Sequence, residues 1–121
     1  YHAMNLLFGG AGSDLQVTGV VDWVNACVGP AAADVSHCRT DLVKMKGPAA
    51  AELFLREYQA VRGGFEYDPV WDLEGAFDVA VPVADVHAPW REFGLAGLRA
   101  DTVQKRVEEH VSRALADLGV A

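Results

Sequence analysis

Two oxygen-bearing side chains stand where two short apolar segments would bring them together. Asn5 lies at the start of the segment 4–8, and Asp22 closes the segment 15–22. Both segments have strand-like composition, and the sequence GGAGSD between them is typical of a hairpin turn. Antiparallel pairing would place an amide oxygen and a carboxylate at the same end of this hairpin. Hard cations such as Mg²⁺ take ligands of this kind, together with phosphate oxygens and water.

Each of these residues also has a plain structural interpretation. An aspartate that follows an apolar run often caps a turn, and Asn5 can serve as a turn asparagine near the first residue of the chain. Neither side chain alone therefore indicates a metal site. The interpretation of Asn5 as a ligand depends on Asp22, and that of Asp22 depends on the sequence around it.

Three blocks in the first third of the chain carry a family resemblance. They are Tyr1–Leu7 (YHAMNLL), Gly19–Ala26 (GVVDWVNA), and Gly29-Pro30 followed by Asp34-Val35. In order and spacing they are similar to the H-G-D-x-H-x-x-N, I-D-W-E-x-A and G-x-P-x-x-D blocks of aminoglycoside phosphotransferases. The chain thus resembles the aminoglycoside phosphotransferase and choline kinase-like family.

The resemblance implies the C-terminal lobe of a protein-kinase-like fold and roles for four residues of this chain. Asn5 and Asp22 would hold Mg²⁺, while His2 and Asp34 would support the catalytic loop. The cofactors would be Mg²⁺ and ATP or another nucleoside triphosphate. The reaction would be transfer of a phosphoryl group to a hydroxyl of a small-molecule acceptor, for example a cationic aminoglycoside.

The same resemblance places the family's catalytic aspartate one residue before Tyr1. The nucleotide-binding lobe would also precede Tyr1, so we expect a C-terminal part that is inactive alone and has the missing N-terminal lobe as its partner. The chain departs from the family pattern at Ala3-Met4, where Pro-Gly is frequent, and at Val24, where Glu is common. These departures would change the loop and its local hydrogen bonding.

An acidic segment follows in the second half of the chain, with aromatic residues between the acids. In the family this part lines the acceptor pocket, so the resemblance assigns acceptor binding to Glu66, Asp68, Trp71 and Asp72. Carboxylates beside aromatic rings suit a cationic acceptor. The alternative is a solvated face, which we favour for most of the acids in the segment, namely Glu66, Asp68, Asp72, Glu74 and Asp78. The three tryptophans, Trp23, Trp71 and Trp90, are more typical of core positions.

Helical periodicity dominates the rest of the sequence. One helix is expected after Pro30, with an apolar face at Val35, Cys38, Leu42 and Met45. A second begins at Pro48, ends at Gly63-Gly64 and carries an i,i+4 pair of Glu52 and Arg56; its apolar face holds Ala51, Phe54, Leu55, Tyr58 and Val61. A short helix near Pro69 is expected to bury Val70, Leu73 and Phe77. The last helix repeats apolar residues at Val103, Val107, Val111, Leu115 and Leu118.

These elements predict an α+β fold that is mostly α, a β-hairpin followed by a helical bundle. We expect one domain over 1–121, divided into a metal-binding hairpin over 1–29 and an acceptor-side bundle over 30–121. The chain has 121 residues and a net charge of -7, which disfavours nucleic acid and anionic membranes as partners. Cys27 and Cys38 form no zinc or disulfide pattern, so we expect free thiols in the cytoplasm.

Two functional hypotheses remain open from the sequence. The first is the C-terminal part of an ATP-dependent phosphotransferase that acts on a small-molecule hydroxyl. The second is a truncated or decayed helical module that binds a partner or associates with itself through an exposed apolar surface.

Overall fold

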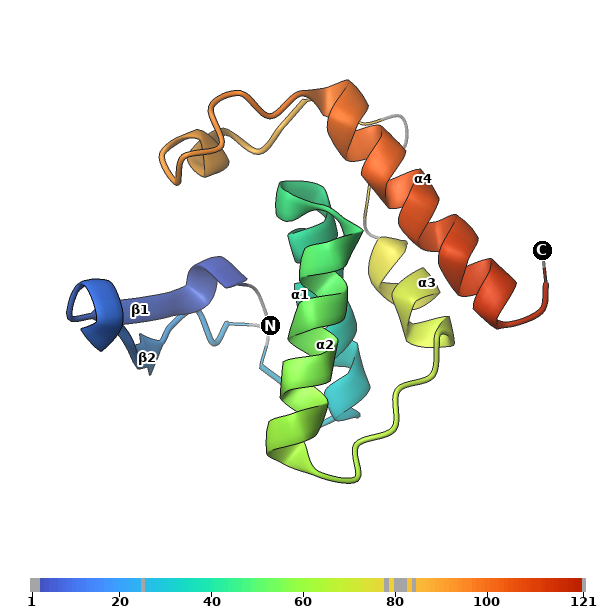
Figure 1. Cartoon of the computed structure of the whole chain (residues 1–121), viewed down its shortest axis with the longest axis horizontal. Helices are drawn as coiled ribbons and strands as arrows, with labels where there is room; N and C mark the ends of the chain where they lie inside the picture. The colour runs from blue at the N-terminus through green and yellow to red at the C-terminus, as the bar shows by residue number, and fades with distance from the viewer. Residues whose placement is uncertain (1–2, 25, 78, 80–82, 84, 121) are drawn as a thin grey trace.

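A β-hairpin followed by four α-helices makes up the described part of the chain (Figure 1). The computed structural model describes residues 3–24, 26–77, 79, 83 and 85–120. Its element order confirms the predicted α+β class with a mostly helical content. None of the described helices is both long and apolar enough to cross a membrane.

The hairpin pairs strand β1 (Leu6–Gly9) with strand β2 (Gln16–Val20) in antiparallel register. Both strands are shorter than the expected segments 4–8 and 15–22, because a 3₁₀ turn occupies Ala3–Asn5 and β2 ends at Val20. The pairs Leu6↔Val20 and Leu7↔Gly19 are followed by a bulge before Phe8. A bulge bends a strand and increases its local twist.

Helix α1 (Ala31–Lys46) is the central element and packs against each of the other three α-helices. Its predicted apolar face is largely confirmed, since Val35, Cys38 and Met45 are buried. The helix ends at Gly47, which has a φ of 96° and donates its N–H to the Val43 carbonyl at 2.9 Å. Glycine adopts this left-handed backbone without steric cost, so the chain reverses sharply there.

Helix α2 (Pro48–Arg62) begins directly after this reversal, with Pro48 in its first turn as predicted. Ala51 is fully buried against the bundle. Val61 was expected on the apolar face but is 90% exposed. The expected ion pair of Glu52 with Arg56 is also absent among the described contacts, because Glu52 binds Arg39 from α1 and Arg56 contacts Glu57.

Helix α3 (Val70–Ala76) is present where a short helix was expected, but it buries a different face. Asp72 and Gly75 are buried, whereas Val70 and Phe77 are exposed. A Cβ atom at Gly75 would lie 2.8 Å from Thr40 Oγ1 and 3.0 Å from the Ser36 backbone. The missing side chain therefore lets α3 approach α1 closely and sets which face turns inward.

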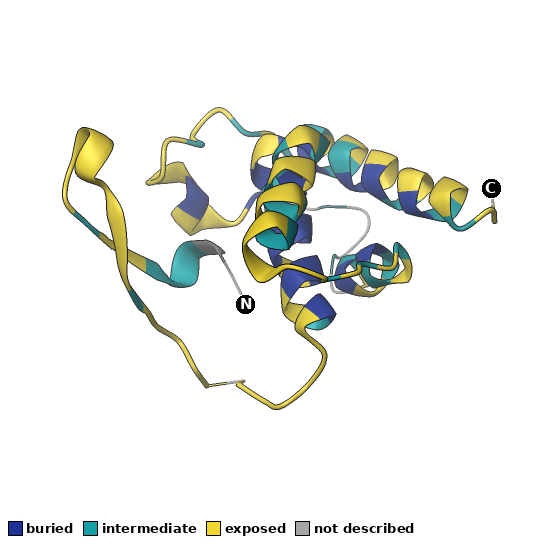
Figure 2. Ribbon diagram, turned by 60° about the horizontal axis from the view of Figure 1, so that its bottom comes forward, coloured by how far each residue is buried: buried dark blue, intermediate teal, exposed yellow. Residues whose placement is uncertain are grey.

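Helix α4 (Ala100–Asp117) follows a 3₁₀ turn at Ala88–Arg91 and covers α1 and α3. Its buried positions are Val103, Val107, His110 and Ala114 (Figure 2). Trp90 is 4% exposed and joins a core cluster whose other buried members are Met45, Val86, Val103 and Val107. Met4 packs against this cluster and so attaches the base of the hairpin to the helices.

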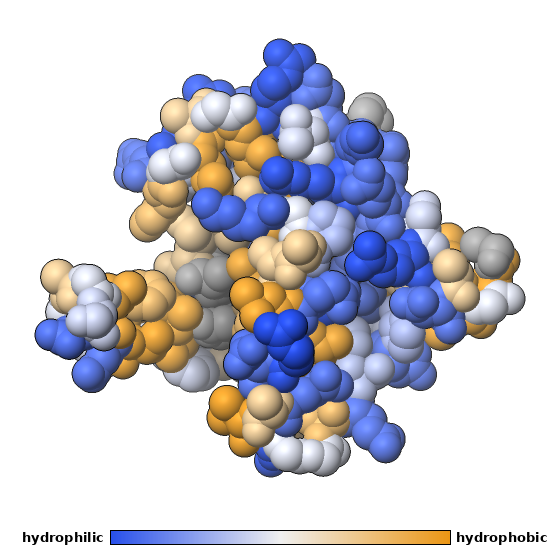
Figure 3. Space-filling view, in the orientation of Figure 1, coloured by the Kyte–Doolittle hydropathy of each residue, from blue (hydrophilic) through white to orange (hydrophobic). Residues whose placement is uncertain are grey.

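The hairpin itself stands away from the bundle and exposes most of its residues (Figure 2). Apolar side chains gather over it in the space-filling view (Figure 3), and its exposed apolar residues include Leu7, Phe8 and Val17. Trp23 was expected in the core but is 67% exposed, because it follows the strand on a segment that no helix covers.

Candidate functional site

The backbone places Asn5 and Asp22 at the same, open end of the hairpin, as predicted from the two strands. The pair Leu6↔Val20 sets the register, and the Val21 N–H donates to the Asn5 carbonyl at 2.9 Å. This bond continues the ladder one step beyond the strands, so Asn5 lies across from Val21 and next to Asp22. The base of the hairpin is in turn held to the helices through Met4.

The backbone of Asp22 has an unusual conformation. Its φ is 63°, and it is the one non-glycine residue with positive φ in the part of the chain that the structure describes. The Trp23 indole N–H donates to the Val20 carbonyl at 2.9 Å, and the Ala26 N–H donates to the Trp23 carbonyl at 3.0 Å. These bonds hold the chain reversal in which Asp22 sits. Left-handed backbone at a non-glycine residue is costly and is concentrated at functional sites.

The electrostatic setting of the Asp22 carboxylate favours a cation. Asp22 is exposed, and Asn5, at the same end of the hairpin, is half-buried. The segment 3–24 contains Asp14 and Asp22 as its charged residues and no lysine or arginine. The hairpin therefore offers no cation of its own to neutralise Asp22.

The donor set at this end of the hairpin is small. Among the described residues, no group of three or more His, Cys, Asp or Glu side chains is placed to hold a metal ion. One carboxylate and one amide oxygen remain at the hairpin end. Mg²⁺ is commonly held by one or two protein oxygens plus phosphate oxygens and water, so this donor set fits a nucleotide-bound Mg²⁺.

The two residues assigned to support of the catalytic loop are differently placed. Asp34 lies exposed in the first turn of α1, where a negative charge interacts favourably with the helix dipole. The segment 21–30 connects this turn to the hairpin. His2 lies outside the described residues.

The residues of the acidic segment that the resemblance assigned to acceptor binding differ in solvent exposure and in hydrogen bonding. Glu66 and Asp68 are exposed, and Trp71 is half-buried. Asp68 accepts a hydrogen bond from the Val70 N–H at 2.9 Å just ahead of α3. Asp68 thus stabilises the start of a helix, which is the usual role of an aspartate at that position.

Asp72 is not part of a solvated face, contrary to the alternative favoured for most of the acids. It is 6% exposed, and its two carboxylate oxygens each accept a hydrogen bond from Arg39 at 2.8 Å. The Tyr67 hydroxyl donates to it at 2.7 Å, and His110 Nε2 lies 3.4 Å away without hydrogen-bond geometry. Its carboxylate is therefore engaged by groups of the protein itself.

These contacts decide the ionisation of Asp72. Burial alone would raise the pKa of its carboxyl, but His110, Arg39 and Tyr67 together hold that pKa well below the ordinary value. Because Arg39 makes two well-aligned bonds, we regard it as the main stabilising partner. Burial and the Asp72 contact raise the pKa of Tyr67 above its usual range.

Arg39 is the central residue that sequence patterns missed. It is 3% exposed on α1 and also donates to the Ala51 carbonyl at 3.0 Å and to Glu52 at 3.0 Å. Its position, four residues after Val35, lies on the apolar face of α1. A charged residue on such a face was the available signal for a buried ion pair.

The hairpin end and the acidic segment do not form one site in this arrangement. Helices α1 and α2 lie between the hairpin and α3 in the cartoon view (Figure 1), and the second view keeps the same order (Figure 2). The structure therefore places Asn5 and Asp22 at one end of the hairpin but does not bring Glu66, Asp68, Trp71 or Asp72 to them.

A comparison with protein-family models matches residues 1–72 to the phosphotransferase enzyme family. This match covers more than half of the 121 residues and includes the hairpin, α1 and α2. The chain belongs to this family. Searches of curated proteins and of solved structures each found no match. The family membership agrees with the resemblance carried by the three sequence blocks, and α4 lies beyond the matched residues.

Proposed function

We propose that this chain supplies the metal-holding hairpin of an ATP-dependent phosphotransferase that acts on a hydroxyl of a small molecule. In this proposal Asp22 and Asn5 hold Mg²⁺ on the nucleotide phosphates, and the helices carry the hairpin. The family membership supports phosphoryl transfer as the reaction class.

The observation that carries the proposal is the backbone of Asp22. A φ of 63° at an exposed aspartate, at the same hairpin end as Asn5 and inside a reversal held by hydrogen bonds, is a strained conformation. It occurs at the position to which the sequence resemblance assigns a metal ligand. A structural turn would be satisfied more easily by glycine. An acid at this position is explained if the carboxylate itself is needed.

The residues of the hairpin would contribute position and charge to the reaction. When bound, Mg²⁺ neutralises charge on the phosphates and helps to orient them. Asp22 would provide a negatively charged oxygen and Asn5 a neutral one. The hydrogen bond of Trp23 to Val20 would keep the Asp22 carboxylate at the hairpin end.

We also propose that the acceptor is a small hydroxyl compound with positive charge. The support is the net charge of -7 on the chain, which favours a cationic ligand. Glu66 and Asp68 carry no part of this proposal, because the structure does not bring them to the hairpin end. Asp72 is left out of this proposal because Arg39 and Tyr67 already occupy its oxygens.

The proposal is tested by binding of Mn²⁺, a paramagnetic substitute for Mg²⁺. In an NMR titration of the 121-residue chain in the presence of ADP, Mn²⁺ should broaden the amide signals around Asn5 and Asp22, and excess Mg²⁺ should reverse the broadening. The Asp22→Asn variant should lose this effect.

Asp14→Asn is the matched control, because Asp14 is also an exposed acid of the hairpin but lies at its tip. This variant should bind Mn²⁺ as the unchanged chain does. Equal loss of the Mn²⁺-induced broadening in both variants would indicate a general effect of hairpin charge. It would contradict the assignment of Asp22 as a ligand.

A further inference from the structure

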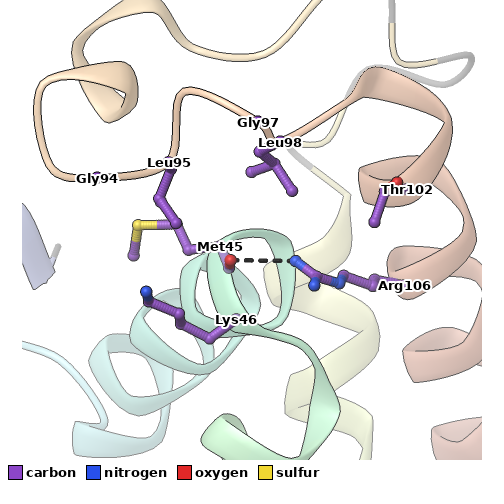
Figure 4. A pocket seen from close by; sticks show the side chains of 8 residues that line it. All are labelled: Met45, Lys46, Gly94, Leu95, Gly97, Leu98, Thr102 and Arg106. Atoms are coloured by element: carbon purple, nitrogen blue, oxygen red, sulfur yellow. Dashed lines mark hydrogen bonds between the residues drawn. The ribbon is translucent and has the colours of Figure 1, made fainter.

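A hollow between α1, the loop before α4 and the first turns of α4 has a chemistry unlike that of the rest of the chain (Figure 4). Its volume is about 390 Å³. The loop residues lie above the end of α1, and α4 closes one side (Figure 4). The side chains that matter for its chemistry are Met45, Lys46, Leu95, Leu98, Thr102 and Arg106.

Arg106 presents a fixed guanidinium group to this hollow. Its Nη1 donates to the Lys44 carbonyl at 2.9 Å and to the Met45 carbonyl at 3.0 Å. Within the described residues its Nε and Nη2 have no hydrogen-bond acceptor. A guanidinium that is already oriented loses little conformational freedom when its remaining donors bind an anion.

Lys46 adds a second positive charge at the end of α1. Its side chain is exposed and forms no ion pair with any acid in the described part of the chain. None of the described side chains that line the hollow is acidic. In a chain with a net charge of -7, a hollow with two cations and no acid is locally selective for negative charge.

The remaining surface of the hollow can accept an apolar group. Leu95 and Leu98 come from the loop and are half-buried, and Met45 forms the surface between them and α1 (Figure 4). Thr102 adds a hydroxyl at the start of α4. We propose that the hollow binds a small organic anion, whose carboxylate or phosphate contacts Arg106 while its apolar part rests on Leu95 and Leu98. The exposed Lys46 side chain adds a second positive charge at the rim and strengthens this binding.

This site uses no residue of the hairpin end and goes beyond the proposed phosphotransfer function. The probes we would use are benzoate and phenyl phosphate, which carry the two anionic groups on the same apolar ring. Benzylamine carries a positive charge on a similar ring and serves as the probe of opposite sign. In NMR titrations of the 121-residue chain, each anion should cause saturable shifts at Met45, Lys46 and Thr102, and benzylamine should cause none there.

Lys46→Gln should weaken binding of the better anion about fivefold, the upper range for loss of an exposed charge contact. Lys105→Gln is the matched control, because it removes the same charge from an exposed position on α4 that does not line the hollow. The control should retain the affinity of the unchanged chain. Equal weakening in the two variants would overturn the proposal, as would benzylamine binding with comparable affinity.

A measurement on the unchanged chain keeps the test independent of variant folding. The affinity for the better anion should fall steadily as sodium chloride is added, because exposed charge contacts are screened by salt. Binding that does not depend on salt would show that the apolar ring alone is recognised and would overturn the proposal. NMR shifts that do not saturate with either anion would also overturn the proposal.

Discussion

At the scale of single residues, Asp22 combines an unfavourable backbone with an exposed charge. Its φ of 63° is a conformation that glycine adopts freely and that a residue with a side chain adopts at a cost. The bonds from Trp23 to Val20 and from Val21 to Asn5 hold the backbone in this state. Stability and metal binding should therefore respond in opposite directions when Asp22 is replaced.

We predict that Asp22→Gly raises the free energy of unfolding of the hairpin by up to about 1 kcal/mol, because glycine relieves the strain of the left-handed backbone. The same variant should lose Mn²⁺ binding. Amide hydrogen exchange of Val21, whose N–H donates across the hairpin to the Asn5 carbonyl, would report hairpin stability. Asp14→Gly, at the tip of the hairpin, is the control and should not combine a more stable hairpin with loss of Mn²⁺ binding. Faster amide exchange of the hairpin in Asp22→Gly than in the unchanged chain would contradict the prediction.

The position of Asn5 and Asp22 at one end of the hairpin could be predicted from sequence, because the glycine-rich turn sets which ends of the two strands meet. The φ of Asp22 could not be predicted from sequence, because it depends on how the segment after the strand turns toward α1. The hollow around Arg106 also escaped prediction. Its cationic residues, Lys46 and Arg106, are far apart in sequence and line one hollow only because the end of α1 contacts α4.

At the scale of elements, helical periodicity identified the helices but did not always identify their buried faces. The buried face of α1 followed the apolar spacing of Val35 and Cys38. The short helix α3 did not follow its spacing, because Gly75 makes close contact with α1 and Asp72 binds Arg39. In a helix of seven residues, two such contacts outweigh the preference of a few apolar side chains.

We predict that Gly75→Ala lowers the free energy of unfolding by about 1–3 kcal/mol, the usual cost of forcing extra volume into a packed interface. The new methyl group would lie 2.8 Å from Thr40 Oγ1 and 3.0 Å from the Ser36 backbone. Urea unfolding monitored by circular dichroism would measure the change.

Gly97→Ala is the control for this substitution, because no atom lies within 4 Å of a Cβ placed there. It should change stability little. A Gly75→Ala variant as stable as the Gly97→Ala variant would mean that α3 does not pack against α1 through this glycine.

At the scale of the whole molecule, a buried polar network joins all four α-helices. Arg39 on α1 contacts Glu52 on α2 and Asp72 on α3, and His110 on α4 approaches Asp72. Tyr67, from the segment before α3, completes the set with its hydrogen bond to Asp72. Removal of one charged member of such a network destabilises the fold, because the opposite charge then stays buried without that partner.

This network predicts the acid sensitivity of the fold. Since the pKa of Asp72 in the folded chain is held below its ordinary value of 3.8, the unfolded chain takes up this proton first as the pH falls. The stabilisation by ionised Asp72 is therefore complete above that value and is lost as the pH falls toward the folded pKa. Asp72→Asn should lower the free energy of unfolding by up to about 3 kcal/mol at neutral pH, because it leaves the buried Arg39 with only the exposed Glu52 as counter-ion.

Urea unfolding at a series of pH values between about 2 and 7 would check both parts of this prediction. The difference between the unchanged chain and Asp72→Asn should be largest at neutral pH and should narrow under acid, because protonation removes the same charge from the unchanged chain. Asp101→Asn breaks an exposed pair with Arg99 and should leave stability nearly unchanged. If the difference in free energy of unfolding between the two chains stays constant down to the lowest pH, the charge of Asp72 does not stabilise the fold. The stabilisation would then come from the shape and hydrogen bonds of the Asp72 side chain alone.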